Sequence, residues 1–159
     1  MHQDHFKRKD CRQCNSKDLT MAIKLKPTPL ANDYVNEKDL KITKKKYPLD
    51  VYFCNSCKHL QLLDVVNPKT LFENYVYVSG TSSVFVKHFE NYAKYLNHNF
   101  NNRGLVIDIG SNDGTILKAF KRLGHKVLGI EPAKAIANEA IENGIETIVD
   151  FFNPVIAAN

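Results

Sequence analysis

Short apolar runs, broken by proline, asparagine and aspartate, fill the first 66 residues of the chain and predict a small, mainly β module. These runs favour strands at about residues 19–24, 40–43, 50–53 and 59–63. Two Cys-x-x-Cys pairs lie in the same region. We therefore expect residues 1–66 to form one module, and the four cysteines are candidates for the groups that stabilise it.

Residues 67–103 show a helical pattern and are expected to connect two modules. The pair Asn67-Pro68 predicts a helix start, with asparagine as the cap, and Gly80 is expected to end this first helix. A second helix is predicted at about residues 82–98. It would place one set of apolar and aromatic side chains on one side, which we expect to pack in the core: Val84, Phe85, His88, Phe89, Tyr92 and Tyr95.

Residues 104–159 alternate between strand and helix patterns. Strands are predicted at 105–109, 126–130 and 145–149, with helices at about 114–123 and 132–142 between them. The first strand is a continuous apolar run, as expected of a strand buried on both faces in a parallel sheet. The order β-α-β-α-β predicts the first half of a doubly wound, Rossmann-like sheet.

The composition excludes several classes of protein. The 159 residues are 43% hydrophobic and 25% charged, as in globular proteins, and no run approaches the roughly 20 apolar residues of a membrane span. The N-terminus, MHQDHFKRKD, has no apolar segment after its charges, so we expect no secretory signal, no membrane partner and a cytoplasmic location.

The net charge of +5 is concentrated in the first module. Residues 1–60 hold 13 basic and 7 acidic side chains, whereas residues 61–159 hold 9 and 10. This imbalance permits a zinc-ribbon module that binds nucleic acid. However, the longest basic run, Lys44-Lys45-Lys46, is short and lies beside turn residues, which is more typical of a solvated loop. A nucleic-acid partner is therefore the weaker alternative.

Four cysteines, Cys11, Cys14, Cys54 and Cys57, are spaced as two Cys-x-x-Cys turns. Each turn directs two thiolates at one point, and four thiolates satisfy tetrahedral Zn²⁺. Because sulfur fills all four positions, we expect the metal to be structural rather than catalytic. Iron in a rubredoxin-like site and redox-active dithiols are the alternatives.

Taken together, these patterns predict an α/β fold class, with a small zinc-binding module followed by helices and a partial parallel sheet.

A glycine-containing turn follows the first parallel strand, in the sequence Asp108-Ile109-Gly110-Ser111-Asn112-Asp113-Gly114. Glycine permits a sharp turn and a close approach of ligand to backbone. The pattern differs from the Gly-x-Gly-x-x-Gly of dinucleotide enzymes, and its acidic residues suit a cationic ligand such as S-adenosylmethionine. We take as cofactor-binding candidates Asp108, Gly110, Ser111, Asn112 and Gly114. The alternative is a turn with no ligand.

Glu131 closes the second parallel strand, where a carboxylate can accept hydrogen bonds from both hydroxyls of a ribose. Asp150 and Phe151 follow the third strand and are further candidates, for contact with an adenine amine and ring face. The alternative for Glu131 is that it only precedes the start of a helix.

With these elements in place, the chain resembles the N-terminal part of the nucleotide-sugar (NDP-hexose) C-methyltransferase family. The matching stretches are Pro29-Leu30-Ala31-Asn32, Cys54-x-x-Cys57 with Leu60-Gln61-Leu62, Leu71-Phe72-x-Asn74-Tyr75-Val76-Tyr77-x-Ser79-Gly80-Thr81-Ser82, Ile107-Asp108-Ile109-Gly110-Ser111-Asn112-Asp113-Gly114 and Gly129-Ile130-Glu131-Pro132. They cover nearly the whole chain in the family's order.

The resemblance implies S-adenosylmethionine as methyl donor and a nucleotide-linked keto-deoxysugar as acceptor. It also implies that Tyr75 and Tyr77 are substrate-side candidates, although both could simply pack a helix. The family's catalytic base lies in a second half with no counterpart here. We therefore expect a chain that is inactive alone, whether it is a shortened form, one half of a split enzyme or a gene remnant. Its partner would be a C-terminal half or a second copy, bound across the exposed edge of the sheet.

Overall fold

The computed structural model describes residues 4–100 and 103–158. The chain divides into two compact units, Met1–Leu71 and Phe72–Asn159, which are described separately below. The predicted boundaries at residues 66 and 103 stay predictions. The predicted helical connector, residues 67–103, lies largely in the second unit.

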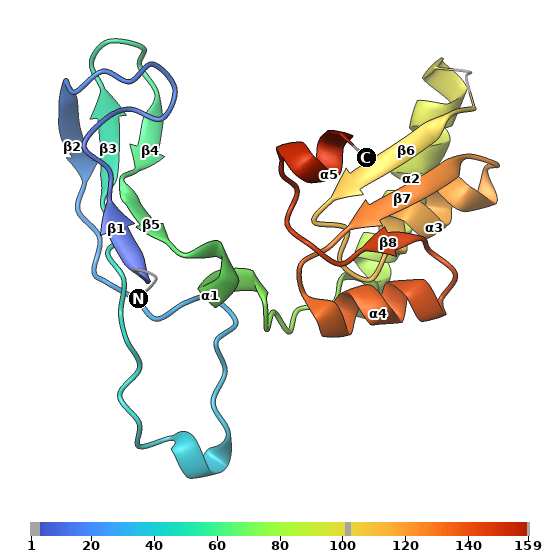
Figure 1. Ribbon diagram of the computed structural model, residues 1–159, viewed down its shortest axis with the longest axis horizontal. Coiled ribbons are helices and arrows are strands. Elements are labelled where there is room, and N and C mark those ends of the chain that lie inside the picture. Colours follow the sequence, from blue (N-terminus) through green and yellow to red (C-terminus); the bar gives the residue numbers. More distant parts are fainter. Residues whose placement is uncertain (1–3, 101–102, 159) are drawn as a thin grey trace. The chain divides into compact units, whose positions relative to one another are not determined.

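The first unit contains two small antiparallel sheets (Figure 1). In one, β1 (His5–Lys7) pairs with β5 (Asp64–Val66). In the other, β3 (Val51–Cys54) lies between β2 (Leu19–Ile23) and β4 (Leu60–Leu62). Three of the predicted strands are thus confirmed, while β1 and β5 were not predicted.

The strand predicted at residues 40–43 is wrong. A 3₁₀ helix occupies Glu37–Asp39, and the turn continues as the Ile42 N–H donates to the Asp39 carbonyl at 2.9 Å. Leu40 and Ile42 are 68% and 61% exposed, so no partner strand covers them. This segment lies within a long loop, residues 29–46, whose two ends are joined by an antiparallel bridge between Thr28 and Tyr47.

The helix predicted from Asn67 to Gly80 is much shorter in the structure. Asn67 does cap it, since its side-chain oxygen accepts from the Lys69 N–H at 3.0 Å, and α1 spans Pro68–Phe72. The next residues, 73–78, are not helical, and a 3₁₀ turn follows at Ser79–Thr81. Alternating tyrosine and valine lose side-chain freedom in a helix.

The second predicted helix is confirmed as α2 (Ser83–Phe100), but the expected packing of its aromatic stripe is wrong. Tyr92 and Tyr95 are 44% and 63% exposed, whereas Ala93 is fully buried. Ala93 and Leu96 belong to the helix face that packs against the core. The small side chain of Ala93 permits this close packing, and the larger aromatic residues lie outside it.

The second unit is built on a parallel sheet with strand order β6-β7-β8, as predicted. Its strands are β6 (Leu105–Ile109), β7 (Lys126–Ile130) and β8 (Thr147–Ile148), and its other helices are α3 (Thr115–Arg122), α4 (Lys134–Glu142) and α5 (Pro154–Ala158) (Figure 1). One core cluster joins α2, α3 and α4 to the sheet through Ala93, Leu117, Phe120, Val127 and Ala140.

The strand β6 is an edge of this sheet and is buried on one face only. Leu105, Ile107 and Ile109 are 58%, 51% and 58% exposed, whereas Val106 packs against the core cluster. The expectation that both faces of β6 are buried is therefore wrong, because the core cluster covers only the face that carries Val106.

Among the described residues, no helix combines the length and apolarity that crossing a membrane requires.

Candidate metal centre and cofactor site

The four cysteines come together in the first unit as the spacing predicted. Their sulfur atoms all lie within 4.8 Å of one another, with 3.6 Å between Cys11 and Cys57 and between Cys14 and Cys54. A tetrahedron with Zn–S bonds of about 2.3 Å has edges of about 3.8 Å. The cluster therefore has the size of a zinc site with four thiolate ligands.

The backbone around the cluster favours thiolates. Burial raises the pKa of Cys11, but hydrogen bonds from the backbone N–H groups of Cys14 and Gln13 and from the Gln61 side chain outweigh it and lower the pKa to about 6. Gln61 is itself buried, and its side-chain oxygen accepts from the Arg12 N–H at 3.0 Å. At Cys57, a backbone hydrogen bond at His59 lowers the pKa, but burial and the neighbouring Cys14, Cys11 and Cys54 outweigh it and raise the pKa to about 12. Four clustered thiols thus need a bound cation to be thiolates together, and Zn²⁺ supplies that charge.

The glycine turn lies at the carboxyl end of β6, the usual ligand-binding edge of a parallel sheet. Gly110 and Gly114 have φ values of 79° and 71°, and Asn112 has a φ of 52°. The N–H groups of Gly110 and Ser111 both donate to the Ile130 carbonyl, at 2.8 and 3.2 Å. These bonds hold the turn against the end of β7, and the positive φ of Gly110 is a conformation that glycine adopts without strain.

The Glu131 carboxylate is directed at this turn. One oxygen accepts from the Asn112 N–H at 2.9 Å, and the other accepts from the Ala133 N–H at 2.8 Å. Glu131 is 6% exposed, so both bonds are shielded from solvent. The carboxylate is thus held beside the turn by two backbone donors, and each oxygen retains a second lone pair for a hydroxyl donor.

A cavity of about 210 Å³ opens beside the turn, lined by Ser79, Phe89, Asp108, Gly110, Ser111, Asn112, Thr115 and Ile116. Burial raises the pKa of Asp108, and the negative charge of Glu131 adds to this rise. The Ser111 hydroxyl is buried and has no hydrogen-bond partner among the described residues. Asp108 and the unpaired Ser111 hydroxyl line this cavity, and Glu131 is bonded to the same turn; this combination fits a ligand that carries an amine and hydroxyl groups.

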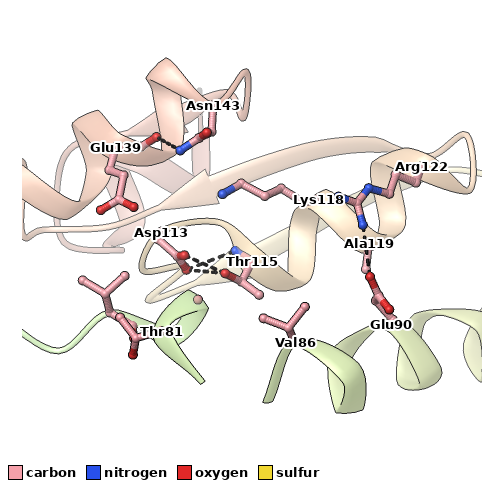
Figure 2. A pocket seen from close by; sticks show the side chains of 12 residues that line it. Thr81, Val86, Glu90, Asp113, Thr115, Lys118, Ala119, Arg122, Glu139 and Asn143 are labelled. Atoms are coloured by element: carbon pink, nitrogen blue, oxygen red, sulfur yellow. Dashed lines mark hydrogen bonds and ion pairs between the residues drawn. The ribbon is translucent and has the colours of Figure 1, made fainter. Parts of the chain in front are cut away.

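Asp113, the acidic residue inside the turn, has a different role from that of Asp108. Its carboxylate accepts from the hydroxyl of Thr115 at 2.6 and 2.7 Å and from the Thr115 N–H at 3.2 Å, which stabilises the start of α3 (Figure 2). It lines a second cavity, of about 400 Å³, together with Lys118, Glu139 and Asn143 (Figure 2). The negative charge of Asp113 therefore does not face the cavity beside Asp108.

Gly114 and Glu131 do not line this cavity, and neither do the remaining four candidates, Asp150, Phe151, Tyr75 and Tyr77. Asp150 is exposed, and its carboxylate accepts from the N–H of the neighbouring Phe151 at 2.6 Å. Tyr77 is 38% exposed, and Tyr75 makes an edge contact with Phe72 at 5.9 Å between ring centroids. These four side chains stay predictions.

Four cavity residues were missed in the sequence, namely Ser79, Phe89, Thr115 and Ile116. Ser79 belongs to a stretch that carried the family resemblance, so its presence had a signal. Phe89 was placed in the aromatic stripe and Ile116 in a helix, and only the tertiary fold brings them to the turn. Gly129, outside the cavity lining, was also missed, and an added Cβ there would meet the Ser111 hydroxyl at 2.5 Å.

Comparison with known proteins bears on the zinc module and on the family resemblance. Residues 11–72 match the family described as a putative zinc-binding domain, Methyltransf_13. The chain is 30% identical over 141 residues to the C-methyltransferase NovU of Streptomyces niveus, a match that covers 87% of this chain and 34% of the relative. The chain thus spans about a third of the length of that relative. The resemblance to C-methyltransferases inferred from the motifs is confirmed.

Proposed function

We propose that this chain, which carries the methyltransferase zinc-binding domain and is related to a C-methyltransferase, supplies the cofactor-binding part of an S-adenosylmethionine-dependent C-methyltransferase. The observation that supports this most directly is the Glu131 carboxylate, fixed beside the glycine turn by two backbone N–H groups next to a cavity that Asp108 lines. We further propose a nucleotide-linked keto-deoxysugar as substrate and the cytoplasm, where four thiols stay reduced, as the location.

In this proposal the chain's own groups bind and orient. Glu131 accepts hydrogen bonds from the two ribose hydroxyls, while Asp108 and the Ser111 hydroxyl face the amino-acid part of the cofactor. The cavity of about 210 Å³ is below the usual 300–1,000 Å³ of small-molecule sites, so it would hold only part of the cofactor. After a base has removed the proton next to the ketone, the bound cofactor would supply the sulfonium methyl group that the substrate enolate attacks, with S-adenosylhomocysteine as the leaving group.

Calorimetry with S-adenosylhomocysteine tests the cofactor site. We expect measurable binding to the wild-type chain and a loss of about tenfold or more in affinity for Glu131→Gln, because hydrogen bonds to a charged acceptor are stronger than those to a neutral one. Glu142→Gln, at the exposed end of α4, is the matched control and should bind like the wild type. Absence of binding at millimolar ligand, with zinc bound and the fold intact, would refute the proposal.

A second role, as the assembly partner of a C-terminal half, is favoured by the uncovered face of β6. Three exposed apolar side chains alternate along an unpaired parallel strand, which is an arrangement suited to further pairing and packing. Size-exclusion chromatography with the remaining part of the related C-methyltransferase tests this role. Complex formation that Ile107→Lys abolishes would support it, whereas self-association of this chain alone would favour a homo-oligomer.

A further inference from the structure

The side chain of Asn112 bonds to the backbone of a segment 33 to 35 residues away. Its Nδ2 donates to the Tyr77 carbonyl at 2.8 Å, and its Oδ1 accepts from the Ser79 N–H at 2.8 Å. The two bonds together use a donor and an acceptor of one amide group. Residues 73–78, named here the tyrosine segment because they carry Tyr75 and Tyr77, are therefore attached at their end to the glycine turn.

A second contact lies next to this pair of bonds. At Gly80, an added Cβ would overlap the Asp113 carboxylate and would approach the Thr115 hydroxyl to 3.0 Å. Figure 2 shows that this carboxylate and hydroxyl are already bonded to each other, so neither can move without breaking an interaction. The chain can therefore pass this close to the start of α3 only with glycine at position 80.

Asn112 also contacts the proposed cofactor site through its own backbone. Its N–H donates to Glu131, and its φ of 52° is a left-handed conformation that asparagine adopts more readily than most residues. One residue thus links the Glu131 carboxylate, through its backbone, to the tyrosine segment, through its side chain. The two stretches Tyr75-Val76-Tyr77-Val78-Ser79-Gly80 and Gly110-Ser111-Asn112-Asp113-Gly114 dock on each other through these contacts.

We propose that Asn112 is a positioning residue, whose side-chain amide fixes the tyrosine segment to the glycine turn. Its functional meaning rests on the function proposed above: the carboxylate beside the cofactor and the tyrosines on the substrate side would belong to one rigid unit. Asn112 was predicted to bind the cofactor. In this inference its side chain is occupied by the protein backbone, and only its position in the turn serves the cofactor.

Hydrogen exchange of backbone amides in the full chain tests the attachment directly. Asn112→Gly keeps the left-handed backbone but removes the side-chain amide. We expect exchange at Ser79, and at Thr81 and Ser82 behind it, to rise by about fivefold or more, as for the loss of one or two hydrogen bonds. The Gly129 amide, bonded to Glu146, should change much less. An equal rise at all these amides would mean general destabilisation and would overturn the proposal.

Two further variants sharpen the result. Gly80→Ala leaves Asn112 intact but disturbs the same docking from the other side, so it should give the same local pattern. Asn15→Gly is the matched control, since Asn15 is another left-handed asparagine, with a φ of 59°, in the first unit. It should leave exchange at Ser79 unchanged. Unchanged exchange at Ser79 in both Asn112→Gly and Gly80→Ala would also overturn the proposal.

Ligand-dependent exchange separates this inference from the proposed function. With S-adenosylhomocysteine, the wild type should gain protection at both the glycine turn and the tyrosine segment, and Asn112→Gly should gain it at the turn alone. Equal gains in both proteins would show that Asn112 does not connect the two. If the wild type binds no ligand, the cofactor proposal fails, and the exchange of the ligand-free variants still decides whether Asn112 holds the segment.

Discussion

The two units of this chain are stabilised in different ways. In the first unit, the buried apolar side chains among the described residues are Cys11, Tyr47, Cys54 and Leu63, and two of these are metal ligands. In the second unit, a continuous cluster of aliphatic and aromatic side chains joins three helices to a sheet. A module with short strands and so small a core depends on its metal, whereas the second unit depends on side-chain packing.

The largest expected effect is the loss of the metal centre. Cys54→Ser, or a strong chelator, should unfold the first unit, because zinc binding to small modules supplies about 10–16 kcal/mol of apparent folding free energy. The second unit should keep its fold. Two-dimensional NMR and zinc analysis measure both outcomes. Ser56→Ala, in the same turn, is the control that should retain zinc, and loss of structure in both units of Cys54→Ser would contradict the contrast drawn here.

The corresponding test of the second unit removes a side chain from its core cluster. Leu117 is fully buried within the cluster, so Leu117→Ala should lower the free energy of unfolding of this unit by about 2–5 kcal/mol. The zinc content should not change. Denaturant titration, followed separately by signals from each unit, checks this result. A simultaneous loss of zinc would show that the units are coupled.

A smaller effect is expected on the uncovered face of the sheet. Ile107 is 51% exposed, so Ile107→Ala should lower the free energy of unfolding of the second unit by less than about 1 kcal/mol. The comparison with Leu117→Ala tests whether position rather than residue type decides the cost. An Ile107→Ala loss as large as that of Leu117→Ala would mean that the face is covered in solution, by a second copy for example, and dilution would then change the stability.

The smallest effect concerns Asp108. Its pKa is raised by burial and by the charge of Glu131, so the folded state disfavours the ionised form. The stabilising contribution of the protonated group is therefore complete at low pH and is lost as pH rises through the raised pKa. Asp108→Asn should stabilise the second unit at pH 7 by less than about 1 kcal/mol, because Asp108 is partly solvated. Thermal unfolding from pH 3 to 7 should show this gain vanish at the acidic end.

The parts of the fold that were predicted correctly depend on local pattern and spacing. The three parallel strands, α3 and α4 follow from apolar periodicity, and the metal cluster follows from two cysteine spacings. Residues 73–78 were mispredicted as helical because the tyrosine and valine alternation was not weighed against the helical repeat, and the bonds of Asn112 to Tyr77 and Ser79, more than 30 residues away, have no signal in a local pattern. The aromatic stripe of α2 has a regular period, but a period identifies a face of a helix and does not show which face meets the core.

The candidate site was predictable to a similar extent. Its turn and the acidic residue after β7 were found because glycine and carboxylate types at strand ends carry information about chemistry. The different roles of Asp108 and Asp113 could not be seen in the sequence, since only the geometry shows that Asp113 bonds to Thr115. The occupation of the Asn112 amide by backbone groups is likewise a property of the tertiary fold.

The long loop of residues 29–46 has a practical consequence for engineering. The bridge between Thr28 and Tyr47 closes its base, and Tyr47 is anchored further by its hydroxyl, which donates to Asp4 at 2.7 Å. Because the entropy of closing a loop grows slowly with length, the loop can be extended near Leu40, which is 68% exposed, at little energetic cost. A fluorescent label or an affinity tag inserted near Leu40 would therefore report on the zinc module without displacing its cysteines.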